Sequence, residues 1–124
     1  MSAFADVGSV PPQRLWEGVV SRTVHGERLT FAIVELEPGA LVPEHRHPNE
    51  QVGILLEGQL TFRVAGELRD LGPGGTWRIL GGQPHEVMAG PDGAVVVEAF
   101  APVREDWDVF EALPTQPGRW PSGS

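Results

Sequence analysis

The chain has 124 residues, of which 40% are hydrophobic, and this is the size of one ordinary domain with a single core. It contains no cysteine, which excludes disulfides, thiolate zinc sites and cysteine nucleophiles. The formal net charge is -8 with only nine Lys and Arg residues, so we expect no nucleic-acid partner, because such binding needs a positive patch.

No apolar run approaches the ~20 residues of a membrane-spanning helix, so we expect no membrane partner. Residues 1–6 show neither the basic nor the apolar region of a secretory signal. Together with the absence of cysteine, these features predict a cytoplasmic protein.

Sixteen glycines and twelve prolines separate the apolar runs, a pattern typical of an all-β protein with many tight turns. In chain order we expect an extended N-terminal arm at 1–12, a β-barrel at 13–113 and a flexible C-terminal tail at 114–124. Within the barrel, apolar alternation and β-branched residues predict eight strands, at 13–24, 29–37, 41–47, 51–56, 59–64, 76–80, 85–89 and 94–101. A helical turn is expected at 106–113. Short strands at this spacing, without a long helix, predict a single-domain sandwich or closed barrel.

Three of the four histidines fall in two places, as His45 and His47 on one expected strand and His85 at the start of another. Side chains alternate along a strand, so His45 and His47 share a face with their backbones about 6.6 Å apart. Two imidazoles so placed can converge on one metal ion, which binds nitrogen at about 2.0–2.1 Å. The fourth histidine, His25, lies near a turn and is expected to be an ordinary surface or edge residue.

A fourth ligand can come from Glu50 or Gln51, which follow the bend signal at Pro48-Asn49. The bend allows the next strand to return its first inward side chain to the same ion. Alternation cannot be followed across a turn, so both residues remain candidates.

The segment Gly39-x5-His45-x-His47-x3-Gln51-x6-Gly58 resembles the first motif of the cupins, with Gln where most members have Glu. A second segment, Gly74-x5-Leu80-x-Gly82-x2-His85, is similar to their second motif, with Leu80 in place of the usual proline. The likeness covers about residues 27–101. It implies a double-stranded β-helix, or jelly roll, and the metal ligands His45, His47, Gln51 and His85.

Three imidazoles and one neutral oxygen would leave a divalent ion with its full charge and with open positions. Such a centre can polarise a carbonyl or hydroxyl of a bound small molecule. Imidazole and amide ligands suit Ni, Zn, Fe, Mn or Co, and the sequence does not choose among these.

The Val-rich strand at 94–101 carries a second group of candidates. Alternation places Val96, Glu98 and Phe100 on one face. If that face is the barrel interior, Glu98 is a carboxylate in an apolar cavity with a raised pKa, suited to proton transfer; if not, it is a solvated strand residue. Arg104 could then pair with a substrate carboxylate at the barrel mouth.

The spacing Glu98-x-Phe100-x3-Arg104 also resembles the cupin branch that degrades pectin and alginate and acts on 4,5-unsaturated monouronates, with Glu98 where that branch has Asp. The resemblance implies that the metal holds the sugar, that Glu98 moves the proton, and that Arg104, with Phe100 beside it, binds the carboxylate. The expected function is therefore metal-assisted isomerisation or ring opening of a small sugar acid.

Two alternatives from other classes remain open. The barrel could be a non-catalytic module that binds or senses a small ligand, in which case Glu98 should point outward. It could instead be an Fe(II)-dependent oxygenase, which would consume oxygen with a suitable substrate. A homodimer is also expected, because apolar residues outside the motifs exceed what a small barrel must bury; these are Trp16, Val19, Val20 and Trp107.

Overall fold

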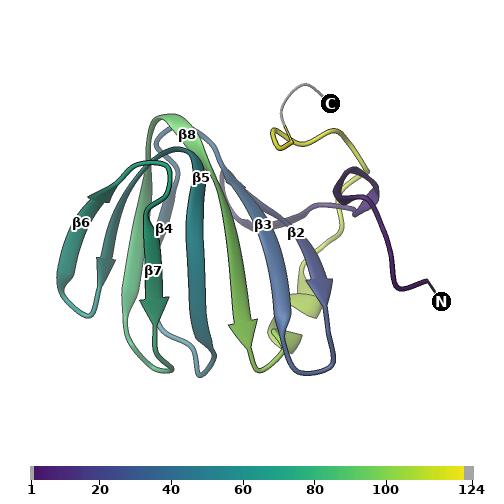
Figure 1. Cartoon of the computed structure of the whole chain (residues 1–124), viewed down its shortest axis with the longest axis horizontal. Coiled ribbons are helices and arrows are strands. Elements are labelled where there is room, and N and C mark those ends of the chain that lie inside the picture. The colour runs from purple at the N-terminus through teal and green to yellow at the C-terminus, as the bar shows by residue number, and fades with distance from the viewer. Residues whose placement is uncertain (1, 122–124) are drawn as a thin grey trace.

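Two long antiparallel strands, β5 (Glu50–Val64) and β8 (His85–Ala101), run side by side through the molecule and pair along most of their length (Figure 1). The structure is a computed structural model that describes residues 2–121. The other strands are β1 (Gln13–Trp16), β2 (Val19–His25), β3 (Thr30–Leu36), β4 (Leu41–His45), β6 (Glu67–Leu71) and β7 (Thr76–Ile79). All the strand pairs are antiparallel.

The eight strands form one continuous sheet, in which the two halves of each long strand have different neighbours. Residues 50–55 of β5 pair with 96–101 of β8, and this pair continues through β3, β2 and β1 on one side and β7 on the other. Residues 60–64 of β5 pair with 85–89 of β8, flanked by β4 and β6. Apolar side chains of both halves form one core, which confirms the expected all-β jelly roll.

Glycine-rich segments mark bends within β5 and β8. The sequence predicted separate strands at 51–56 and 59–64, and at 85–89 and 94–101, but each pair is one strand with irregular register near Gly58. Gly58 has φ +87°, and a Cβ at this position would overlap the carbonyl oxygen of Gly93. A turn signal in the sequence cannot distinguish a chain reversal from a bulge that carries a strand into the next sheet.

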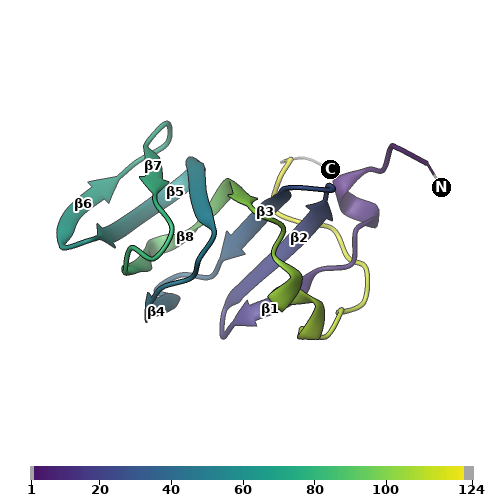
Figure 2. The same ribbon diagram turned by 90° about the horizontal axis from the view of Figure 1, so that it is seen from below.

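Two further differences lie at the edges. The strand expected at 13–24 is a hairpin of β1 and β2 that reverses at Gly18, whose φ is +75°. Strand β6 was not predicted, because its residues are almost entirely exposed and show no apolar alternation. The helical turn expected at 106–113 is a shorter 3-10 helix, η2 (Glu105–Val109), which lies beside β1 (Figure 2).

The C-terminal segment contacts the outer face of β2 and β3. Buried Arg22 pairs with Glu35 at 2.6 Å and donates to the carbonyl of Gln116 at 2.9 Å. The backbone N–H of Arg119 donates to Glu35, and its guanidinium donates to the carbonyl of Leu36. Another 3-10 turn, η1 (Val7–Ser9), lies near this segment at the same side of the molecule (Figures 1 and 2). Among residues 2–121, no helix has the length and apolar character needed to cross a bilayer.

Candidate metal centre

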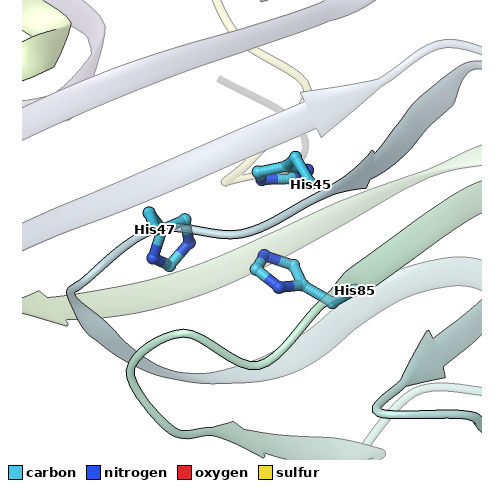
Figure 3. A group of neighbouring side chains, drawn as sticks. All are labelled: His45, His47 and His85. Atoms are coloured by element: carbon cyan, nitrogen blue, oxygen red, sulfur yellow. The ribbon is translucent and has the colours of Figure 1, made fainter.

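His45, His47 and His85 come together at one end of the barrel (Figure 3). His45 ends β4 and is directly opposite His85, the first residue of β8, while His47 follows two residues later. One ligating nitrogen from each of the three side chains lies within 4.8 Å of the others. His25, at the end of β2, is not part of this group and contacts Thr30 instead.

Each of the three imidazoles is oriented by a backbone carbonyl. The Nδ1 atoms of His45, His47 and His85 each lie 2.9 Å from a carbonyl oxygen, those of Pro43, Asn49 and Gln83 respectively. A carbonyl oxygen only accepts hydrogen bonds, so each Nδ1 carries the proton. The three Nε2 atoms therefore offer lone pairs, the form in which histidine binds a metal.

Gln51 lies against this cluster, while Glu50 is exposed. The Gln51 amide nitrogen donates to Glu98 Oε1 at 2.9 Å, and this contact turns its carbonyl oxygen toward His47, 3.1 Å from Nε2. Of the two residues left open by the sequence, Gln51 is thus the one whose oxygen reaches the histidines.

The charge states of His47 and His85 suit a cation. Burial, with the nearby charge of Arg104, lowers the pKa of His47 below its usual value. Burial also lowers the pKa of His85 to about 4, with the charges of the other two histidines contributing. Neutral His47 has its single proton on Nδ1, so its Nε2 and the Gln51 oxygen face each other with lone pairs only. A positive ion between them satisfies both atoms, and the residues present therefore fit a divalent metal.

A cavity of about 290 Å³ opens beside the histidines and is lined mainly by apolar side chains. Glu98 lines it, on the inward face predicted by strand alternation. Burial raises the pKa of the Glu98 carboxyl to about 7, against the hydrogen bond from Gln51, which lowers it. The nearby indole N–H of Trp77 also lowers this pKa. Trp77 Nε1 is buried and forms no hydrogen bond within residues 2–121.

Arg104 and Phe100 lie in the wall of the same cavity. Arg104 is 7% exposed, and its guanidinium carbon lies 4.9 Å from the Phe100 ring centroid and 4.6 Å from that of Trp107. Phe100 in turn lies edge-on to the His47 ring, with the centroids 6.0 Å apart. The structure therefore brings Glu98, Phe100 and Arg104 to the cavity that adjoins the histidines.

Three residues at the site were not predicted from the sequence. Trp77 follows from alternation along β7, where it and Ile79 are the buried positions. Asp106 pairs with Arg104 through both carboxylate oxygens, and the Trp107 ring lies under the same guanidinium at cation–π distance. The only sequence signal for Asp106 and Trp107 is that they follow Arg104 closely in the chain. This closeness does not show that the chain turns back over the cavity there.

Comparisons with known proteins agree with this geometry. The cupin domain family model matches residues 32–100. The chain is 24% identical over 99 residues to the pectin degradation protein KdgF of Dickeya dadantii (strain 3937). These residues make up 78% of this chain and 90% of that protein. Its fold is similar to that of KdgF from Halomonas sp., with a TM-score of 0.78, 24% identity and coverage of 86% and 98% of the two chains. It is likewise similar to an RmlC-like cupin from Shewanella frigidimarina NCIMB 400, with a TM-score of 0.80, 21% identity and coverage of 86% and 96%.

The family match spans more than half of the chain and includes the two segments that carry the three histidines. The protein belongs to the cupin family.

Proposed function

We propose that this cupin binds one divalent transition metal through His45, His47, His85 and Gln51 and isomerises a small sugar acid, such as a 4,5-unsaturated monouronate. The observation that carries the proposal is the contact between Gln51 and Glu98, because it places a carboxylate of the cavity next to the metal ligands. When bound, the metal, one of Ni, Zn, Fe, Mn or Co, would polarise an oxygen of the substrate.

Glu98 is proposed to move the proton. In a 4,5-unsaturated monouronate, opening the ring removes the proton of the anomeric hydroxyl, breaks the bond between C1 and the ring oxygen, and adds a proton at C4. The product is a linear keto-uronate of the same formula, so neither oxidant nor reductant is needed. A single carboxylate can accept the first proton and return it at C4.

Arg104 and Phe100 are proposed to bind the substrate. The guanidinium supplies a positive charge for the uronate carboxylate. The Phe100 ring adjoins both this guanidinium and the His47 ring. The similarity to a protein named for pectin degradation supports a uronate substrate.

The test is turnover of purified metal-loaded protein with 4,5-unsaturated monouronates. The enol-ether absorbance should disappear with the wild type, and Glu98→Gln should slow this loss at least ~100-fold, in the range typical of general acid–base catalysis. A wild type that leaves the absorbance unchanged would reject the substrate. Oxygen uptake with the Fe(II)-loaded protein would instead support the oxygenase alternative, and ligand binding without turnover would support the sensing alternative.

We also propose that the protein is a cytoplasmic homodimer. Val19 and Trp107 are buried in the barrel core and are not available to a partner. On the outer sheet face, however, Val24, Phe31 and Val52 stay exposed, and the register places Val24 opposite Phe31 on adjacent strands. Sedimentation equilibrium should give about twice the monomer mass of 13.4 kDa, and a monomer throughout the micromolar range would reject the dimer.

A further inference from the structure

The Arg104 guanidinium is already held on one edge by Asp106. Arg104 Nε donates to Asp106 Oδ1 at 3.0 Å, and Nη2 donates to Oδ2 at 2.9 Å. The side chain of Arg104 is 8% exposed and that of Asp106 is 62% exposed. The ion pair therefore runs from the cavity wall to the rim of the barrel, with Asp106 on the solvent side.

Two aromatic rings contact the same guanidinium. Phe100 and Trp107 meet at 71° with centroids 5.0 Å apart, and the Arg104 guanidinium carbon lies within 5 Å of both ring centroids. These cation–π contacts hold the centre of the guanidinium but do not by themselves determine which of its edges faces the cavity. The paired contact with Asp106 fixes which edge does so.

A guanidinium can bind a carboxylate in paired fashion through its Nε/Nη2 edge or through its Nη1/Nη2 edge. Asp106 occupies the first edge. Arg104 Nη1 makes no hydrogen bond within residues 2–121, and Arg104 lines the cavity together with Glu98 and His47. The Nη1/Nη2 edge is thus the one left for a ligand in the cavity.

We propose that Asp106 is a positioning residue that makes the site selective for a carboxylate bound to the Nη1/Nη2 edge of Arg104. The inference rests on the proposed function, because it assigns the substrate carboxylate to Arg104. Asp106 also lines the cavity, but it does not occupy the edge that the carboxylate would use, since it contacts the Nε/Nη2 edge. Without it the guanidinium would be free to turn its Nη1/Nη2 edge away from the cavity, and the carboxylate would lose one of its two hydrogen bonds.

The test compares Asp106→Asn, which keeps the side-chain volume, with Asp106→Glu, which keeps the charge. Glu105→Gln is the matched control, because Glu105 is an exposed acid on the same 3-10 helix and makes no side-chain contact with Arg104. With a 4,5-unsaturated monouronate, we expect Asp106→Asn to raise KM about tenfold with kcat nearly unchanged. Asp106→Glu should recover part of that loss, and Glu105→Gln should behave as the wild type.

A second measurement does not require turnover. The Nε–H resonance of Arg104, identified by its loss in Arg104→Lys, can be followed by NMR while sodium acetate is added to the metal-loaded protein. Acetate should shift this resonance in the wild type and in Glu105→Gln at concentrations about tenfold lower than in Asp106→Asn. Near-ultraviolet circular dichroism of each variant checks that it is folded.

The two measurements separate the two proposals. A wild type that does not turn over the uronate but shows the acetate difference would reject the proposed substrate and keep the role of Asp106. Equal or tighter acetate binding in folded Asp106→Asn would overturn the positioning role, whatever the turnover, because Asp106 would then be a bystander or a competitor.

Discussion

The side-chain amide of Gln51 joins Glu98 to the histidine cluster, with its nitrogen 2.9 Å from Glu98 Oε1 and its oxygen 3.1 Å from His47 Nε2. The amide suits both neighbours because its nitrogen donates to the Glu98 carboxylate, while its oxygen offers a lone pair to the same ion as His47 Nε2. A carboxylate at position 51 could not donate to Glu98 while ionised. This explains in physical terms why glutamine suits this position although most cupins, by the resemblance, have glutamate.

Replacing Gln51 by Glu should therefore make the metal-free protein sensitive to pH. At pH 8 the new carboxylate and that of Glu98 would repel each other, and the hydrogen bond that Gln51 donates to Glu98 would be lost. We therefore expect a decrease of about 1–3 kcal/mol in the free energy of unfolding. At pH 5 one carboxyl can hold a proton and donate it to the other, so the loss should be small. Urea denaturation at both pH values measures the difference. Glu50→Gln, at the exposed neighbouring position, serves as the control, and an equal loss at both pH values would contradict the explanation.

The metal content of the protein should depend on His47 and not on His25. His47→Ala removes one of three converging Nε2 donors, and we expect metal content after purification without a nickel column to fall at least about tenfold. His25→Ala removes an imidazole outside the cluster and should leave the metal content unchanged. Elemental analysis provides the measurement. Equal metal in both variants would reject the site.

The buried carboxyl of Glu98 should destabilise the metal-free protein at high pH. Its pKa is about 7 in the folded chain and 4.5 in the reference state, so the folded state binds more protons between these values. The stability contributed by the protonated Glu98 carboxyl is thus fully present below pH 4.5 and is lost as pH rises through 7. Glu98→Gln removes this dependence and should be more stable than the wild type by about 3 kcal/mol above pH 7, with no difference below pH 4.5. Chemical denaturation from pH 4 to 8 tests it, and a Glu98→Gln protein less stable than the wild type at pH 8 would contradict the assignment.

His85 should make the metal-free protein less stable as the pH falls, whereas Glu98 does so as the pH rises. Its pKa is lowered from 6.5 to about 4, so the unfolded chain binds the proton first as pH falls. The stability of the metal-free protein that depends on neutral His85 is present above pH 6.5 and is lost between pH 6.5 and 4, with a slope of up to about 1.4 kcal/mol per pH unit. His85→Gln should flatten the curve of unfolding free energy in this range. An unchanged slope would show that another group takes up the proton.

Gly53 should not tolerate a methyl group. A Cβ at this position would overlap the indole ring of Trp77, which is buried beside the cavity. We expect Gly53→Ala to cost about 1–3 kcal/mol in the free energy of unfolding, as overpacking commonly does. Gly72→Ala is the control, because a Cβ there meets no atom within 4 Å. Thermal unfolding compares the two, and equal melting temperatures would show that Trp77 can move aside.

The strand content and the shared face of His45 and His47 could be predicted from the sequence because both depend on local rules. Alternation places His45 and His47 on one face of a strand, and the same rule places Val96, Glu98 and Phe100 together. The bends at Gly58 and Gly93 were misread as turns, since local sequence shows where a chain bends and not which strand it meets afterwards. Strand β6 was missed because its five residues show no apolar alternation, although Leu71 at its end packs against the core.

The amino-acid sequence by itself determined the class of the fold and the shared face of His45 and His47, because period-two alternation and residue type are local properties, while His85 was assigned by the resemblance to the second cupin motif. Only the tertiary structure decided between Glu50 and Gln51, since that choice depends on the path of the chain after Pro48. It also decided that Asp106 meets Arg104 and that Trp77 lies near Glu98. Trp77 and Glu98 are distant in the sequence, and the distance between them is set when β7 and β8 pair with opposite sides of β5.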